Sequence, residues 1–306
     1  MKKVLVIGAG NVGAHIINYG VSKNVGAEFY LLDLNQELEK AQIMDLQDTL
    51  LFSKRSKVEG INFDDPSIQD MDVVIVTAGA AQESGESRCK LLQKNRNILG
   101  KIARSLGSLK PTAIVLLVTN PVDILTHVAY ELFDLPKSQI FGTGTILDSA
   151  RLRWRISEHN KINVKNVHGY VLGEHGDSEF VAWSTVKPGG NSLSDPEKEA
   201  LEKSVQQAAY EIIDGKGSTY FGISAATISL LGAILHDSRE IYPVSTIYPH
   251  SGHQSLSRTP IGVPAVIGAA GIDHVPRMNL TTEELKKLEK SADKLYALYD
   301  SCPLNS

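Results

Sequence analysis

Cysteine is almost missing from this chain, which has only Cys89 and Cys302 among its 306 residues. Two isolated cysteines give neither the ligand spacing of a zinc site nor the repeated pairs of a disulfide-rich secreted domain. We therefore expect no disulfide framework and no bound metal. Such sparse use of cysteine is consistent with a reducing cytoplasm.

An excess of charge of one sign and long apolar runs are missing as well. The net charge of −4 and the pI near 6.1 argue against a dedicated nucleic-acid surface. No segment approaches the roughly 20 apolar residues that span a bilayer. The run Val4–Ile7 after two lysines superficially resembles a secretory signal, but Gly8 and Gly10 cut it too short. We expect a soluble, cytoplasmic protein that binds neither nucleic acid nor membranes.

The first half of the chain alternates regularly between short apolar strands and helices. We expect strands at 4–7, 28–32, 73–77 and 113–118, and helices at 12–22, 37–51, 91–106 and 122–132. Wholly apolar strands that alternate with helices predict a parallel sheet covered on both faces. In such a doubly wound α/β sheet, ligands bind beyond the carboxyl ends of the strands.

The pattern changes after about Phe141. Strand-like pieces lie around 167–172, the segment 241–271 resembles antiparallel strands, and helices are expected from about 147 and over 197–214, 221–235 and 282–298. This mixture predicts an α+β unit. We place the boundary near residue 142, with residues 1–142 as the first domain and 143–306 as the second.

A glycine pattern, Gly8-x-Gly10-x-x-Gly13 with Val12 inside it, directly follows the first strand and opens the first helix. Its glycines permit a tight turn, close approach of a pyrophosphate, and close strand–helix packing. Asp33 ends the second strand, where a carboxylate suits the ribose hydroxyls of NAD and repels the extra phosphate of NADP. A structural turn beside a surface aspartate is the alternative, but this context favours an NAD site.

Six motifs follow one another in an order typical of one family: Gly8–Gly13, Thr77–Ala80, Gly85–Arg88, Thr119–Asp123, Gly142–Asp148 and Gly173–Asp177. With these motifs the chain resembles the L-lactate dehydrogenases of bacterial type, within the lactate/malate dehydrogenase group, over essentially its whole length. The resemblance implies a Rossmann domain followed by an α+β catalytic domain, a homotetramer, and NADH-dependent reduction of pyruvate to L-lactate. It also implies that Gly79, Ala80, Thr119 and Asn120 contact the cofactor.

His175 is the candidate proton donor. Hydride transfer to a ketone creates an alkoxide, and a histidine has a pKa suited to protonating it at cytoplasmic pH. Asp148, the partner that the resemblance implies, would stabilise the imidazolium and orient the ring. Asp177 is a rival partner because it lies two residues away. An ordinary surface or core histidine is the alternative, which the surrounding motif disfavours.

Two arginines suit an anionic substrate. Arg151, three residues after Asp148, would bind the substrate carboxylate through its planar guanidinium. By resemblance, Arg88 belongs to a mobile lid that would bring positive charge beside the substrate carbonyl and exclude water. Asn120 would orient the carbonyl. Solvated surface charges are the alternative for either arginine alone.

Substrate choice depends on Gln82 and Thr219. Malate dehydrogenases of the group carry arginine at the position of Gln82, so a neutral glutamine disfavours a second substrate carboxylate. Thr219 matches the residue near the substrate methyl group. Glu83 and Ser84 depart from the usual lysine and proline, which leaves open a larger apolar 2-keto acid, as taken by L-2-hydroxyisocaproate dehydrogenases.

Arg153 and His168 match positions that bind fructose 1,6-bisphosphate between subunits of bacterial lactate dehydrogenases. Two symmetry-related pairs would form a cationic site. Pairing with local carboxylates is the alternative.

Two other classes fit less well. An NAD-dependent glycosidase should carry a cysteine and histidine suited to a metal, and Cys89 and Cys302 offer no such arrangement. A non-catalytic NAD sensor need not keep His175, Asp148 and both arginines together.

Overall fold

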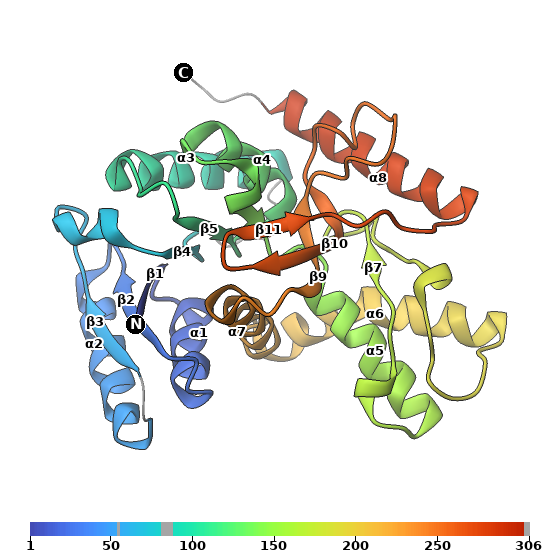
Figure 1. The fold of residues 1–306 in the computed structure, drawn as a ribbon, viewed down its shortest axis with the longest axis horizontal. Coiled ribbons are helices and arrows are strands. Elements are labelled where there is room, and N and C mark those ends of the chain that lie inside the picture. The colour runs from blue at the N-terminus through green and yellow to red at the C-terminus, as the bar shows by residue number, and fades with distance from the viewer. Residues whose placement is uncertain (54–55, 81–87, 303–306) are drawn as a thin grey trace.

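The computed structural model describes residues 1–53, 56–80 and 88–302, without the side chain of Arg88. Its centre is a nine-stranded sheet in the order β3-β2-β1-β4-β5-β6-β9-β10-β11 (Figure 1). The first six strands are parallel: β1 (Lys2–Ile7), β2 (Ala27–Leu32), β3 (Lys57–Gly60), β4 (Val73–Val76), β5 (Ile114–Leu117) and β6 (Ile140–Gly142). Their order is that of the Rossmann fold.

Helices cover both faces of this sheet, as strands apolar on both sides require. Residues in β4 and β5 are all buried. The eight α-helices in the described ranges are α1 (Asn11–Ser22), α2 (Gln36–Asp48), α3 (Arg88–Leu106), α4 (Val122–Leu132), α5 (Ile146–Asn160), α6 (Asp195–Lys216), α7 (Phe221–His236) and α8 (Thr282–Ser301). None of them is both long and apolar enough to cross a membrane.

Two apolar cores lie on the two sides of the sheet. One contains Ile17 of α1 and Ile228 of α7. The other contains Leu92 of α3, Leu125 of α4 and Leu288 of α8. Figure 1 shows α3, α4 and α8 above the sheet and α1, α2 and α7 below it. The doubly wound architecture expected from the alternating pattern is confirmed.

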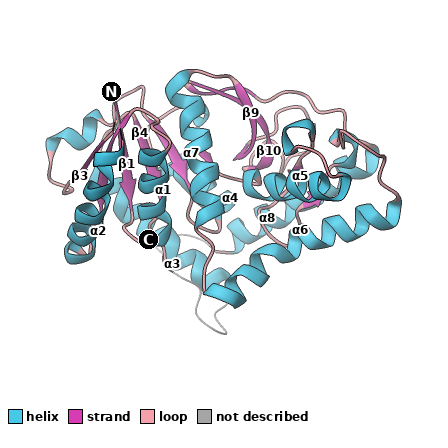
Figure 2. Ribbon diagram, turned by 90° about the horizontal axis from the view of Figure 1, so that it is seen from below, coloured by secondary structure: helices cyan, strands magenta, loops and turns pink. Residues whose placement is uncertain are grey.

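The antiparallel strands of the second half continue the same sheet. β9 (Glu240–Thr246), β10 (Ile261–Gly268) and β11 (Gly271–His274) pair in turn. β9 joins the parallel part through the pairing of Gly142 with Ser245. A separate ribbon, β7 (Val171–Leu172) with β8 (Phe180–Val181), packs with α5 and α6 around a third core. Figure 2 shows this second half beside the Rossmann half.

Several element boundaries differ from the sequence-based expectation. The helix expected at 37–51 ends at Asp48 and gives way to a 3-10 turn, Thr49–Phe52. Helix α3 begins at Arg88, three residues before its first expected residue, Leu91. β3 and β6 were not anticipated because they have four and three residues, too few to establish a period.

The expectation that the two cysteines form no disulfide is wrong. Cys89, in the first turn of α3, forms a disulfide with Cys302, which directly follows α8. Aromatic contacts reinforce this junction: the Tyr299 ring stacks on His127 of α4, with centroids 4.0 Å apart, and the guanidinium of Arg96 lies over the same ring. Two cysteines 213 positions apart carry no sequence signal that could have paired them.

We expect reduction of this disulfide to lower the melting temperature by about 5–10 °C, because the bond closes a long loop in the unfolded chain. Thermal melts with and without a thiol reductant, at one protein concentration, measure the effect. Cys302→Ser should melt at the lower temperature under both conditions. Equal melting temperatures for oxidised and reduced wild-type protein would contradict the expectation.

Candidate active site

The glycine motif forms a tight turn between β1 and α1. Gly8 has φ +113°, a conformation that side chains rarely adopt, and a Cβ there would lie 2.6 Å from Oγ1 of Thr77. A Cβ on Gly13 would lie 1.9 Å from the carbonyl oxygen of Gly8. Gly10 precedes α1 and meets nothing within 4 Å, so the helix amino terminus stays open to a ligand. The turn has the shape that a pyrophosphate needs.

Asp33 lies beside this turn. Its carboxylate accepts hydrogen bonds from the backbone N–H groups of Ala9, at 2.7 Å, and Asn35, at 2.8 Å. Glu39 in turn accepts from the N–H of Asp33. A cavity of about 370 Å³ adjoins Asp33 and is lined by residues after β2 and β3. The residues present therefore fit the adenosine end of NAD.

The ends of β4 and β5 are joined by a buried residue that sequence reasoning missed. Asn95 of α3 accepts from the N–H of Ala80 at 2.7 Å and donates to the carbonyl of Asn120 at 2.8 Å. A Cβ on Gly79 would lie 2.3 Å from Cγ2 of Thr119, so these two strand ends pack closely. Asn95 therefore holds the expected cofactor residues that follow β4 next to those that follow β5.

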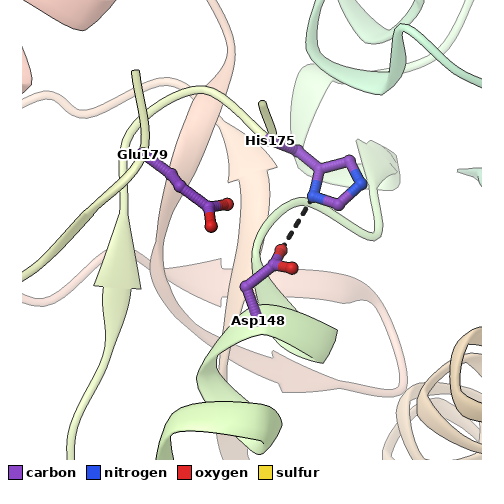
Figure 3. Close-up of side chains that lie close together, drawn as sticks. All are labelled: Asp148, His175 and Glu179. Carbon is purple, nitrogen blue, oxygen red and sulfur yellow. Dashed lines mark hydrogen bonds and ion pairs between the residues drawn. The ribbon is translucent and has the colours of Figure 1, made fainter. Parts of the chain in front are cut away.

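His175, Asp148 and Arg151 form one hydrogen-bonded group (Figure 3 shows the first two). Oδ2 of Asp148 lies 2.7 Å from Nδ1 of His175, and Oδ1 accepts from Nη1 of Arg151 at 2.8 Å. Asp148 and Arg151 lie in the first two turns of α5, so their separation of three positions puts them on one face. One carboxylate therefore orients both the proposed proton donor and the proposed anion binder.

The charges of this group set its protonation state. Burial works to lower the pKa of His175, but the Asp148 carboxylate outweighs it and raises that pKa to about 9. Burial alone would raise the pKa of Asp148, yet His175 and Arg151 hold it below its usual range. At neutral pH the pair is therefore an imidazolium and a carboxylate.

The segment that carries His175 is held by contacts from α4 and α8. Asp123, buried at the start of α4, accepts from the N–H of His175 at 2.8 Å. Burial raises the pKa of Asp123 to about 6. From α8, Ser291 accepts from the N–H of Glu174, and Lys294 binds the Glu174 carboxylate at 2.8 Å. The sequence motif included Asp123 but gave no sign of this supporting role.

The two candidate partners of His175 have different contacts. Oδ1 of Asp177 accepts from the hydroxyl of Tyr210 on α6, whereas Asp148 contacts the ring. Both aspartates line a cavity of about 330 Å³, together with Arg151, His175 and Glu179. A larger hollow of about 610 Å³ between the ends of α3 and α4 contains none of these residues. Glu179, a buried carboxyl beside Asp148, was missed because nothing in the sequence distinguishes it.

The other predicted site residues either make no hydrogen bond with this group in the described ranges or lie outside those ranges. Thr219 is half-buried between α6 and α7, and no hydrogen bond in the described ranges joins it to His175. Arg153 donates from Nε to the carbonyl of Ser149, and burial lowers its pKa. His168 is exposed, and its backbone pairs with Lys187. The expectations for Gln82 and for the Arg88 side chain fall outside the described residues.

A dinucleotide loop, together with a histidine–carboxylate–arginine group at one cavity, defines an NAD-dependent dehydrogenase of the Rossmann class. The chain belongs to the lactate/malate dehydrogenase family. Residues 2–142 match that family's NAD-binding domain, and residues 145–301 match its alpha/beta C-terminal domain.

Named relatives match along nearly their full length. The chain is 38% identical to L-lactate dehydrogenase 1 of Listeria monocytogenes, covering 98% of this chain and 96% of that one. It is 37% identical to L-lactate dehydrogenase of Kosmotoga olearia, with the same coverages. A solved lactate dehydrogenase, MGS-M5 from a deep-sea metagenome library, matches with a TM-score of 0.93, 34% identity and 98% coverage of both chains. The minor L-lactate dehydrogenase of Enterococcus mundtii has the same TM-score, with 32% identity and 99% coverage of both.

We expect Asp148→Asn to lower the pKa of His175 well below about 9, because the carboxylate that raises it most is removed and only the weaker effects of Glu179 and Asp123 then oppose burial. Because the histidine must be protonated to reduce a ketone, the loss of activity on the alkaline side should then begin at a lower pH. The NMR titration of the His175 ring and the pH profile of kcat/KM measure this shift. Asp177→Asn is the matched control and should leave the pKa in place. An equal fall in both variants would show that Asp148 is not the determining partner.

Proposed function

We propose that this protein is an NAD-dependent L-lactate dehydrogenase that interconverts pyruvate and L-lactate in the cytoplasm. The observation that carries the proposal is the single carboxylate of Asp148 shared by His175 and Arg151. The proposal is also supported by the 38% identity of this chain, over almost its whole length, to a named L-lactate dehydrogenase. In fermentation, this reaction would return NAD⁺ to glycolysis.

The residues divide the work as follows. NADH, when bound, supplies the hydride. His175, positively charged because Asp148 raises its pKa, gives its Nε2 proton to the oxygen of the reduced carbonyl and recovers a proton in lactate oxidation. Arg151 binds the substrate carboxylate and so fixes the reacting carbon. Arg88 and Asn120 would polarise and orient the carbonyl.

Cofactor binding is assigned to two groups of residues. Gly8, Gly10, Val12 and Gly13 would hold the pyrophosphate, and Asp33 the adenosine ribose. Gly79, Ala80, Thr119 and Asn120, at the ends of β4 and β5, would line the nicotinamide side. The close packing of these strand ends through Asn95 supports the second assignment.

Pyruvate is the proposed keto acid. Gln82 is neutral and would leave a second substrate carboxylate without a partner, which disfavours oxaloacetate. Thr219 would lie near the substrate methyl group. Nothing in the comparisons favours the larger 2-keto acids of L-2-hydroxyisocaproate dehydrogenases.

We also propose a homotetramer regulated by fructose 1,6-bisphosphate. Large apolar side chains on the outer surfaces of several elements, Leu51, Phe52, Trp154 and Phe221, are more than half exposed in the single chain and suit burial between subunits. Arg153 and His168, each paired with its counterpart in a neighbouring subunit, would bind the phosphates.

An NADH-oxidation panel with pyruvate, 2-ketoisocaproate and oxaloacetate tests the activity. We expect pyruvate to give the highest kcat/KM. His175→Ala should lower turnover by about 10²–10⁴-fold because the proton donor is lost. NADH binding to that variant, followed by fluorescence titration, should be unchanged. Preference for oxaloacetate would refute the role given to Gln82, and full activity of the His175 variant would refute the mechanism.

Adding fructose 1,6-bisphosphate should lower the KM for pyruvate and increase the oligomer size in size-exclusion chromatography. Arg153→Gln should abolish both responses, because it removes charge from the proposed phosphate site. Glu199→Gln, an exposed change elsewhere on the second domain, should keep them. A bisphosphate that changes neither KM nor size would overturn the regulatory proposal.

A further inference from the structure

Glu179 is a buried carboxyl with no counterpart in the mechanism above. It immediately precedes β8, is 7% exposed, and lines the same cavity as His175 and Arg151. Figure 3 shows its carboxyl group turned toward Asp148 and His175. A polar atom of each of these three side chains lies within 4.8 Å of the other two. Among the described residues, no side chain or backbone N–H donates a hydrogen bond to the Glu179 carboxyl.

The balance of charge in the cavity depends on whether Glu179 is ionised. His175 and Arg151 contribute two positive charges, and Asp148 neutralises one of them. The remaining positive charge suits one substrate carboxylate. An ionised Glu179 would cancel that charge, and substrate binding would then bury an uncompensated negative charge, which is costly.

We propose that Glu179 is a positioning residue for the substrate anion. In its protonated form it leaves the charge of Arg151 and His175 available to the substrate carboxylate. When it loses its proton, it weakens substrate binding and sets an alkaline limit on it. The substrate part of this inference rests on the proposed 2-keto acid activity.

The surroundings of Glu179 favour the protonated form. Burial contributes most and Asp148 next, and together they raise the pKa of Glu179 to about 8, although His175 and Arg151 oppose the rise. Glu174, bound to Lys294 of α8, acts in the same direction as Asp148.

The cavity lining contains one further carboxylate, Asp177, beside uncharged groups of α6. Across it, α6 presents Gln206, Gln207 and Tyr210, whose hydroxyl binds Asp177. Because the pKa of a carboxyl is raised, its neutral form persists below about pH 8 and the charged form appears as the pH increases through that value.

The protonation state can be measured without any substrate. The difference infrared spectrum of the wild-type protein and Glu179→Gln at neutral pH should contain the carbonyl stretch of a neutral carboxylic acid in the wild type. That band should disappear as the pH is raised through about 8. If the difference spectrum shows a carboxylate at neutral pH, the proposal is overturned whatever the enzyme acts on.

The effect on binding is tested by the pH dependence of KM and kcat for pyruvate. Between pH 7 and pH 9 we expect KM to rise about tenfold more in the wild type than in Glu179→Gln, because a carboxyl with a pKa near 8 is mostly ionised at pH 9. Each protein is compared with itself at pH 7, so the readout is the change of KM with pH and not the absolute activity of a variant altered in the cavity lining. Glu199→Gln, an exposed carboxyl of α6, should follow the wild-type profile.

The outcomes separate this inference from the proposed activity. Parallel KM profiles in wild type and Glu179→Gln, despite an infrared band of a neutral acid, would overturn the role in substrate binding. If no 2-keto acid supports NADH oxidation, the proposed activity fails, and the infrared measurement still decides whether Glu179 is protonated. If Glu179 had only a structural role, Glu179→Gln would lower kcat at every pH and keep the wild-type dependence of KM on pH. That outcome would also overturn the proposal.

Discussion

The carboxylate of Asp148 is the constraint on which the rest of the site depends. It is almost fully buried, and a buried charge is tolerated only when it is paired on each side. His175 and Arg151 provide those pairings, so the same contacts that make Asp148 acceptable inside the protein also orient the two groups that would handle proton and anion. Removing either cation would leave a buried charge short of a partner, and removing the carboxylate would leave two cations side by side.

Elements of both domains hold these groups in place from distant parts of the sequence. The His175 segment is bound by the start of α4, by α8, and by β10 through the mutual hydrogen bonds of Gly173 and Gly262. The contacts of Asp123, Ser291 and Gly262 use backbone N–H or carbonyl groups of the segment, so the His175 side chain stays directed at the cavity. A histidine in a loop thus acquires the rigidity of a residue in a regular element.

Much of the fold was predictable from the sequence because its strands are wholly apolar and its helices are periodic. The glycine turn, Asp33 and the Asp148–His175 pairing follow from local motifs or from family resemblance. Asn95, Asp123 and Glu179 were missed as supporting residues because their importance arises from neighbours distant along the chain. The pairing of Cys89 with Cys302 was missed for the same reason. Sequence periodicity describes which face of an element is buried, but not which buried polar group meets another.

The pairing of Gly142 with Ser245 makes the sheet continuous from β3 to β11. Two domains that share an unbroken sheet cannot swing about a hinge between them without breaking ladder hydrogen bonds. The cofactor half and the substrate half therefore behave as one rigid platform. A ligand held at the carboxyl ends of the parallel strands would then lie at a distance from His175 that is set when the chain folds.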